Sequence, residues 1–127
     1  PRLGESGSTS ITGLVTSSIA TFDSARAARY DQDIAPAIPG YGVLHLLTAT
    51  LCAELLAEAG RGAPDARVLL AGAGTGAELS ALASAGPGWR FVAADPSAEM
   101  LAHLRTRVAS LRLGERVVVH EGAVSAL

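Results

Sequence analysis

The spacing of hydrophobic residues predicts two helices in the first half of the chain. Apolar positions recur every three or four residues over 22–34 and again over 43–59, which is the period of an amphipathic helix. Pro36 and Pro39 are expected to end the first helix. In the second helix one face carries a leucine stripe made of Leu44, Leu47, Leu51 and Leu55. We expect this leucine stripe to be buried against the rest of the protein.

Short apolar runs predict three strands in the second half, over 67–71, 89–95 and 116–120. The first run is unbroken, so we expect both of its faces to be buried, and we expect Trp89 to cover the sheet edge. Helical patterns separate the runs, and strands that alternate with helices of this length imply right-handed crossovers and a parallel sheet. The sequence therefore predicts an α/β fold, a Rossmann-like parallel sheet preceded by helices.

The same patterns divide the chain into three parts. Residues 1–20 are rich in Ser, Gly and Thr and are expected to form a flexible N-terminal segment. Within it, residues 11–18 fit neither the helical nor the strand period, so their structure stays open. Residues 21–62 form a predicted helical cap, and residues 63–127 form the βαβαβ unit.

The segment after the first predicted strand carries three glycines at alternate positions, Gly72, Gly74 and Gly76, which we call the glycine turn. Glycine is needed where a turn takes positive φ or where a ligand must approach the backbone without meeting a Cβ atom. Asp95 ends the second predicted strand, at the distance where nucleotide-binding folds place a carboxylate on ribose hydroxyls. The glycine turn and this acid together predict a nucleoside-binding half-site.

Composition narrows the classes of function. The net charge is −2, lysine is absent and the arginines are scattered, so there is no basic stripe to support nucleic-acid binding. The single Cys52 precludes an internal disulfide and indicates a reducing, cytoplasmic setting. No apolar run approaches the roughly 20 residues that span a bilayer, so we expect no membrane association. The three histidines lack metal-ligand spacing, so no metal site is expected.

Three segments at the ends of the predicted strands follow one another along the chain: Val68–Gly76, Asp95–Met100 and Val118–Gly122. This order resembles the class I S-adenosylmethionine-dependent methyltransferases, in which a glycine turn follows the first strand and an acid follows the second. The resemblance implies S-adenosyl-L-methionine as the cofactor and methyl transfer as the activity of the intact protein. It also implies that this chain is the first half of a seven-stranded fold.

The resemblance assigns cofactor contacts residue by residue. Asp95 is implied to accept the ribose hydroxyls, and Pro96 and Met100 to flank the adenine. The other implied cofactor-binding positions of the strand ends are Gly72, Ala73, Gly74, Gly76, Gly122 and Ala123. Two positions depart from the family pattern, because the family commonly has Asp where this chain has Ala123, and many members have Asp where it has Ala71. The chain therefore lacks the side chain for one adenine contact, and the backbone around Ala123 and Val124 is the candidate to replace it.

The helical cap resembles a subset of these enzymes through Phe22–Asp31 and Ile38–Tyr41. That subset includes the carboxy-S-adenosylmethionine synthases, whose Pro-Gly-Tyr segment contributes to the cofactor pocket. Tyr41 is therefore a candidate to close over the cofactor, with Tyr30 as a second candidate. His45 follows Tyr41 by one helical turn and is a candidate to face the same pocket.

Two alternatives stay open at this point. Gly72-x-Gly74-x-x-Ala77 also satisfies a dinucleotide fingerprint, which favours an NAD-dependent oxidoreductase. The short length and Ala123 also fit a non-catalytic nucleotide-binding or interaction module. Binding of nicotinamide nucleotide, or the absence of any methyl transfer, distinguishes these alternatives from the methyltransferase.

The small number of predicted strands has consequences for activity and assembly. Members of the resembled family usually position the methyl acceptor with residues that follow the fourth strand, so we assign no catalytic residue and expect this chain alone to be inactive. The acceptor is unknown, with a small molecule as the first choice and RNA or protein as alternatives. A bare edge on the first strand predicts a homodimer through that edge, or its coverage by residues 11–18.

Overall fold

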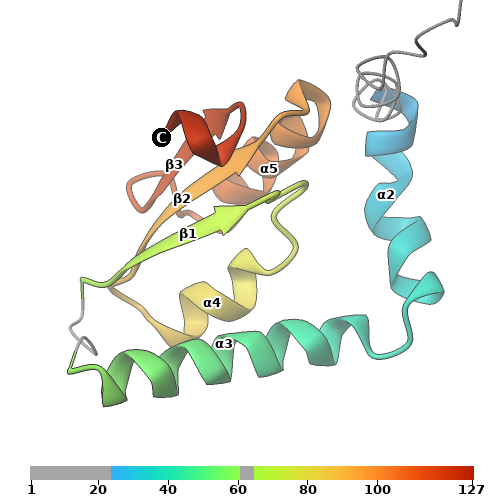
Figure 1. The fold of residues 1–127 in the computed structure, drawn as a ribbon. Coiled ribbons are helices and arrows are strands. Elements are labelled where there is room, and N and C mark those ends of the chain that lie inside the picture. The colour runs from blue at the N-terminus through green and yellow to red at the C-terminus, as the bar shows by residue number, and fades with distance from the viewer. Residues whose placement is uncertain (1–23, 61–64) are drawn as a thin grey trace, which may run out of the picture.

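The computed structural model describes residues 24–60 and 65–127. The predicted flexible segment 1–20, the open segment 11–18 and the first two residues of the predicted helix 22–34 lie outside the described residues. Two helices precede the sheet, α2 (Ser24–Ala37) and α3 (Tyr41–Glu58). Figure 1 shows α3 running beneath α4 and the sheet, and α2 beside the end of the glycine turn.

Three parallel strands form the sheet in the order β1 (Arg67–Ala71), β2 (Arg90–Asp95) and β3 (Val117–Glu121). Apolar, β-branched runs favour strands, and the helices between them allow the parallel return (Figure 1). The α/β prediction with a Rossmann-like parallel sheet preceded by helices is therefore confirmed. The register places Ala71 beside Ala94 and Asp95 beside Glu121, so the carboxyl ends of all three strands meet at one edge.

Helices α4 (Leu79–Ala85) and α5 (Ala98–Ser110) connect the strands, and a short 3₁₀ helix, η1 (Val124–Ala126), follows β3. Both connecting helices bury leucines in one core with alternate strand residues. Its most enclosed large side chains are Leu79, Leu82, Phe91, Leu101 and Leu104. The core therefore lies between one face of the sheet and the helices.

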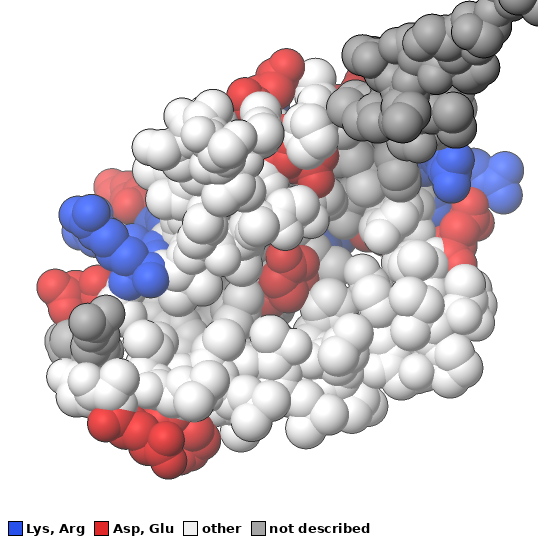
Figure 2. Space-filling view, viewed as in Figure 1, with Lys and Arg blue, Asp and Glu red and all other residues white. Residues whose placement is uncertain are grey.

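The expectation that the leucine stripe of α3 is buried was wrong. Leu44, Leu47, Leu51 and Leu55 are 53%, 55%, 62% and 63% exposed. The helix packs with its opposite side, where Ala49 is buried and Cys52, Ala53 and Leu56 contact the core. Because α3 is apolar around its circumference, its sequence does not show which face meets α4. Figure 2 shows the surface over α3 as almost free of charge, with acidic side chains near its carboxyl end.

The expectation that β1 is buried on both faces was also wrong. Leu70 points into the core, whereas Leu69 is 49% exposed. Leu69 is in register with Val92, and Val92 with Val118, which is 64% exposed. These three residues form one row on the sheet face away from α4 and α5. Within the described residues, that face and the outer edge of β1 have no covering element.

Two smaller expectations, on the end of the first helix and on Trp89, were also wrong. Helix α2 continues beyond Ile34 and contains Pro36, and it ends one residue after this proline. Trp89 is 5% exposed and lies in the core instead of covering the sheet edge. The Arg116 guanidinium donates to the carbonyls of Trp89 and Gly86, at 2.9 and 2.6 Å, and so fixes the entry to β2.

Helix α3 is long and apolar enough to cross a membrane when judged by length and composition alone, with 18 residues and a mean hydropathy of 1.2. In the described part of the chain it is the one helix with this property. It nevertheless contacts the core through Ala49, Cys52 and Leu56. We therefore treat α3 as part of the α/β unit.

Candidate functional site

The glycine turn adopts the backbone conformation for which the three glycines were singled out. Gly72, Gly74 and Gly76 have φ of 65°, 53° and 70°. Residues with a Cβ atom rarely adopt this left-handed backbone conformation, because the Cβ atom then approaches the following carbonyl oxygen. The turn between β1 and α4 therefore requires glycine at all three positions.

The three glycines face different surroundings. A Cβ atom added at Gly72 meets nothing within 4 Å, whereas one at Gly74 lies 3.3 Å from Cε of Met100. One added at Gly76 lies 2.9 Å from Cδ1 of Leu79 and 3.1 Å from Cγ of Leu104, both in the core. Gly72 thus offers open backbone to a ligand, and Gly76 allows α4 and α5 to pack closely.

Gly76→Ala is expected to destabilise the chain more than Gly72→Ala. Both substitutions place a side chain at positive φ, at a cost of about 1–2 kcal/mol. Only Gly76→Ala adds a clash with Leu79 and Leu104, which lowers the unfolding free energy by about a further 1–3 kcal/mol. Urea unfolding of the two variants measures the difference, and equal losses of unfolding free energy would contradict the packing role of Gly76.

The turn is joined to the carboxyl end of β2 by its own amides. The Ala73 N–H donates to the Ala94 carbonyl at 3.0 Å, and the Gly74 N–H donates to Oδ2 of Asp95 at 2.9 Å. The other carboxylate oxygen, Oδ1, accepts the Ser97 N–H at 2.8 Å. The structure therefore brings the glycine turn and Asp95 together, as the sequence predicted. Each carboxylate oxygen keeps a lone pair for a further donor, such as a ribose hydroxyl.

The other predicted positions near Asp95 fall at different depths. Pro96 is exposed at the rim, and the Gly122 N–H donates to the Asp95 carbonyl at 3.0 Å. Ala123 is exposed and precedes η1. Met100 is only 5% exposed and lies beneath Gly74, so its side chain supports the turn from the core side.

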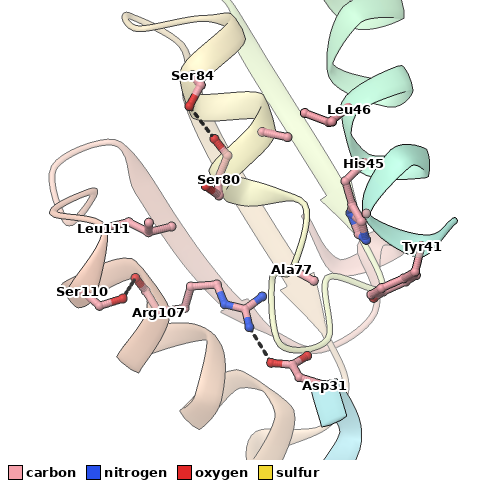
Figure 3. A pocket seen from close by; sticks show the side chains of 12 residues that line it. Asp31, Tyr41, His45, Leu46, Ala77, Ser80, Ser84, Arg107, Ser110 and Leu111 are labelled. Atoms are coloured by element: carbon pink, nitrogen blue, oxygen red, sulfur yellow. Dashed lines mark hydrogen bonds and ion pairs between the residues drawn. The ribbon is translucent and has the colours of Figure 1, made fainter. Parts of the chain in front are cut away.

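Tyr41 is the first residue of α3. It lines a groove of about 620 Å³ bounded by α2, α3, α4 and α5, which we call the helix groove. Figure 3 shows Tyr41 and His45 side by side, and their rings meet edge to face with centroids 4.4 Å apart. His45 also lines the helix groove, whereas Gly72, Gly74 and Asp95 do not. That Tyr41 and His45 face the cofactor stays a prediction. Burial, with Tyr30 and Asp31 nearby, raises the pKa of Tyr41.

Three polar residues that the sequence did not single out meet between the helix groove and the glycine turn. Thr75 donates its hydroxyl to Oδ1 of Asp31 at 2.6 Å, and Arg107 forms an ion pair with Oδ2 of the same carboxylate. Figure 3 shows the ion pair of Asp31 and Arg107 below Ala77. The contacts join positions 44 and 76 residues apart, a distance at which periodicity gives no signal. The one local signal is the position of Thr75 between two glycines.

Glu78 precedes α4 and is half-buried beside this cluster. Burial raises the pKa of its carboxyl group above its ordinary value of 4.5, and the nearby His45 and Arg107 oppose this change. No group of three or more His, Cys, Asp or Glu side chains suited to a metal ion occurs among the described residues.

The pKa of Glu78 is higher in the folded chain than in the unfolded chain, so the protonated carboxyl group favours folding. This stabilisation is fully present below about pH 4.5 and is lost as the pH rises through the pKa of the folded chain. At neutral pH the ionised carboxylate therefore disfavours folding. Glu78→Gln is expected to be more stable than wild type at neutral pH, with the gap narrowing as the pH approaches 4.5. Urea unfolding across this range checks the sign, and a gap that widens toward acid pH contradicts it.

The second half of the chain matches a family model. Residues 68–127 match the model described as a methyltransferase domain. No curated protein sequence matches the chain. The matched segment begins within β1 and contains the glycine turn, Asp95 and β3.

Several solved structures share the fold. A candidate S-adenosyl-L-methionine-dependent methyltransferase from Methanococcus maripaludis is 21% identical, covers 95% of this chain and 47% of its own, and has a TM-score of 0.65. An S-adenosylmethionine-dependent methyltransferase from Aquifex aeolicus is 22% identical over 80% of this chain and 48% of its own, with a TM-score of 0.51. The N-terminal domain of human METTL16, solved with S-adenosylhomocysteine, is 18% identical over 66% of this chain and 35% of its own, with a TM-score of 0.55. At these identities the likeness shows the fold, and the chain spans about half the length of the first structure.

Proposed function

We propose that this chain, which has the fold of class I S-adenosylmethionine-dependent methyltransferases and matches their domain model over residues 68–127, forms the cofactor-binding part of such an enzyme. The observation that carries the proposal is the junction of the glycine turn with Asp95 at the carboxyl edge of the sheet. In open α/β sheets, ligands bind outside the carboxyl ends of the strands. The open backbone at Gly72 and the free lone pairs of Asp95 suit the two ends of a nucleoside ligand.

S-adenosyl-L-methionine fits the residues present at this edge. Gly72 lets the methionine part approach the main chain without a Cβ atom in the way. Asp95 holds the turn and the start of α5 while its remaining lone pairs accept ribose hydroxyls. Pro96 and Ala123 are both exposed, and we expect the adenine to rest against them. The cofactor supplies a methyl group on a sulfonium, and the protein's task is to orient it.

The methyl acceptor and the residues that orient it are not assigned. Methyl transfer by this fold depends on holding a nucleophile in line with the sulfonium methyl, which is a matter of proximity and orientation. The described strands provide the cofactor edge alone. We therefore propose that the 127-residue chain by itself does not transfer methyl groups, with a small molecule as the first choice of acceptor for the whole enzyme and RNA or protein as alternatives.

Calorimetric titration of S-adenosylhomocysteine into the chain tests the proposal, with NAD titrated in parallel. Saturable binding of S-adenosylhomocysteine and none of NAD is the expected result. Binding of NAD alone would establish the oxidoreductase alternative. If neither ligand binds, the proposal fails for this chain, and the non-catalytic interaction module becomes the better account.

A homodimer through the β1 edge is the proposed assembly. Strand β1 pairs with β2 on one side and with no described residue on the other. A bare edge with an exposed Leu69 beside it favours pairing with another strand. Light scattering after size-exclusion chromatography tests this. A monomer whose β1 amides exchange rapidly would contradict both the dimer and coverage by residues 11–18.

The cytoplasm is the proposed location. Cys52 is the single cysteine and has no partner for an internal disulfide. Proteins of reducing compartments commonly keep such thiols free. Appearance of a tagged full-length protein outside the cytosolic fraction would contradict this proposal.

A further inference from the structure

We propose that Asp31 is a positioning residue that fixes the glycine turn from its helical side and so couples the docking of α2 to cofactor binding. The proposal rests on the proposed function of the neighbouring edge. Asp31 belongs to α2, Thr75 to the glycine turn and Arg107 to α5. One carboxylate thus ties together three segments that are distant in sequence (Figure 3).

The turn is held from two opposite sides by two carboxylates. On the sheet side, Asp95 accepts the Gly74 N–H at 2.9 Å. On the helical side, Asp31 accepts the hydroxyl of the next residue, Thr75, at 2.6 Å. Gly74 and Thr75 are adjacent, so the two contacts together determine how the turn is oriented between β2 and α2.

Thr75 makes the contact with Asp31 important to the turn. Thr75 is 3% exposed, and among the described residues it is the one polar residue that is buried. A buried hydroxyl that loses its acceptor carries an unmet desolvation cost. Without Asp31 the turn is expected to rearrange until the Thr75 hydroxyl finds water or another acceptor, and the backbone at Gly72 and Gly74 would move with it.

The contact also attaches α2 to the rest of the chain. Ala27 is the one residue of α2 that is buried. The joint to α3 contains Gly40, with φ of 78° and open space around it. Asp31 is therefore a polar anchor of a helix that has one buried residue. A ligand that stabilises the glycine turn in its present shape will also favour the docked α2, because both share the bond between Thr75 and Asp31.

Asp31→Ala and Thr75→Val test the proposal, with Asp33→Ala as the matched control. Asp33 is on the same helix, where it forms an exposed ion pair with Arg29 at 3.7 Å. Calorimetry is expected to show that each test variant binds S-adenosylhomocysteine on the order of tenfold more weakly. The double variant is expected to bind no more weakly than Asp31→Ala, because Thr75→Val removes a bond that Asp31→Ala has already removed. Asp33→Ala is expected to bind as wild type.

A second readout needs no ligand. In the free chain, Asp31→Ala is expected to speed amide exchange at Thr75 and Gly76 while leaving Phe91 and Ala93 of β2 unchanged. If Asp31→Ala only lowered the stability of the whole fold, amide exchange would instead become faster throughout the core. Asp31→Asn keeps an acceptor oxygen for the hydroxyl and is expected to recover most of the affinity, which guards against a variant that fails to fold.

The outcomes separate this proposal from the proposed function. If the wild-type chain does not bind S-adenosylhomocysteine, the proposed function fails. If the wild type binds and both test variants bind equally well, the role of Asp31 fails while the function stands. The role of Asp31 also fails if the losses of affinity in Asp31→Ala and Thr75→Val add fully in the double variant. It fails likewise if Asp31→Ala leaves amide exchange at Thr75 unchanged.

Discussion

Gly86→Ala is expected to destabilise the chain by about 3 kcal/mol, at the upper end of the cost of overpacking a core. A Cβ atom built on Gly86 lies 1.9 Å from Cδ2 and 2.1 Å from Cε2 of the Trp89 indole. Trp89 is 5% exposed and packs in the core, so the ring has little room to withdraw. Gly86 has φ of −127°, which any residue adopts, so the effect is steric and not a matter of backbone strain. Urea unfolding measures it.

Gly114→Ala is the matched control, because a Cβ atom there meets nothing within 4 Å. Its unfolding free energy is expected to stay within about 0.5 kcal/mol of wild type. The clash also predicts coupling: Gly86→Ala should cost less in a Trp89→Leu background, since the indole is then absent. Equal costs in the two backgrounds would show that Trp89 does not set the requirement for glycine.

Asp95→Ala is expected to weaken S-adenosylhomocysteine binding by about 1–3 kcal/mol, the cost of losing hydrogen bonds to a charged acceptor. The substitution removes the acceptor for the ribose hydroxyls and also the acceptor of the Gly74 and Ser97 amides. Asp95→Asn is expected to be intermediate, because an amide side chain has one acceptor oxygen for two N–H donors. Calorimetric titration measures all three proteins.

Glu121→Ala provides the comparison for Asp95→Ala. Glu121 is in register with Asp95 at the end of the neighbouring strand and is exposed. It carries the same charge at the same edge of the sheet, so a general electrostatic effect would appear in both variants. Binding is expected to be unchanged in Glu121→Ala. A loss equal to that of Asp95→Ala would mean that the charge of the edge, and not the specific acceptor, holds the ligand.

Local signals predicted the elements around the site well. Ser97 precedes α5 as its N-cap, with its Oγ accepting the Met100 N–H at 3.2 Å, as expected of a serine at a helix start. Three alternate glycines predicted a left-handed turn, and all three have positive φ. The junction of the turn with Asp95 followed from the strand order, because parallel strands bring their carboxyl ends to one edge.

The sequence was a poor guide wherever two surfaces were equally apolar. The leucine stripe of α3 satisfies the helical period, yet the opposite face packs on the core. The run in β1 is continuous, yet Leu69 is 49% exposed while Leu70 lies in the core. A period identifies residues that share a face and says nothing about what lies opposite that face.

The sequence by itself determined the order of helices and strands, the glycine turn, and the acid that meets it. These depend on backbone freedom, hydrogen-bond capacity and hydrophobic period, which are properties of neighbouring residues. Only the tertiary structure decided that Gly76 serves packing while Gly72 opens to a ligand, and that Asp31 reaches Thr75 across 44 residues. Those roles depend on which surfaces of distant segments meet, and a local pattern does not encode that choice.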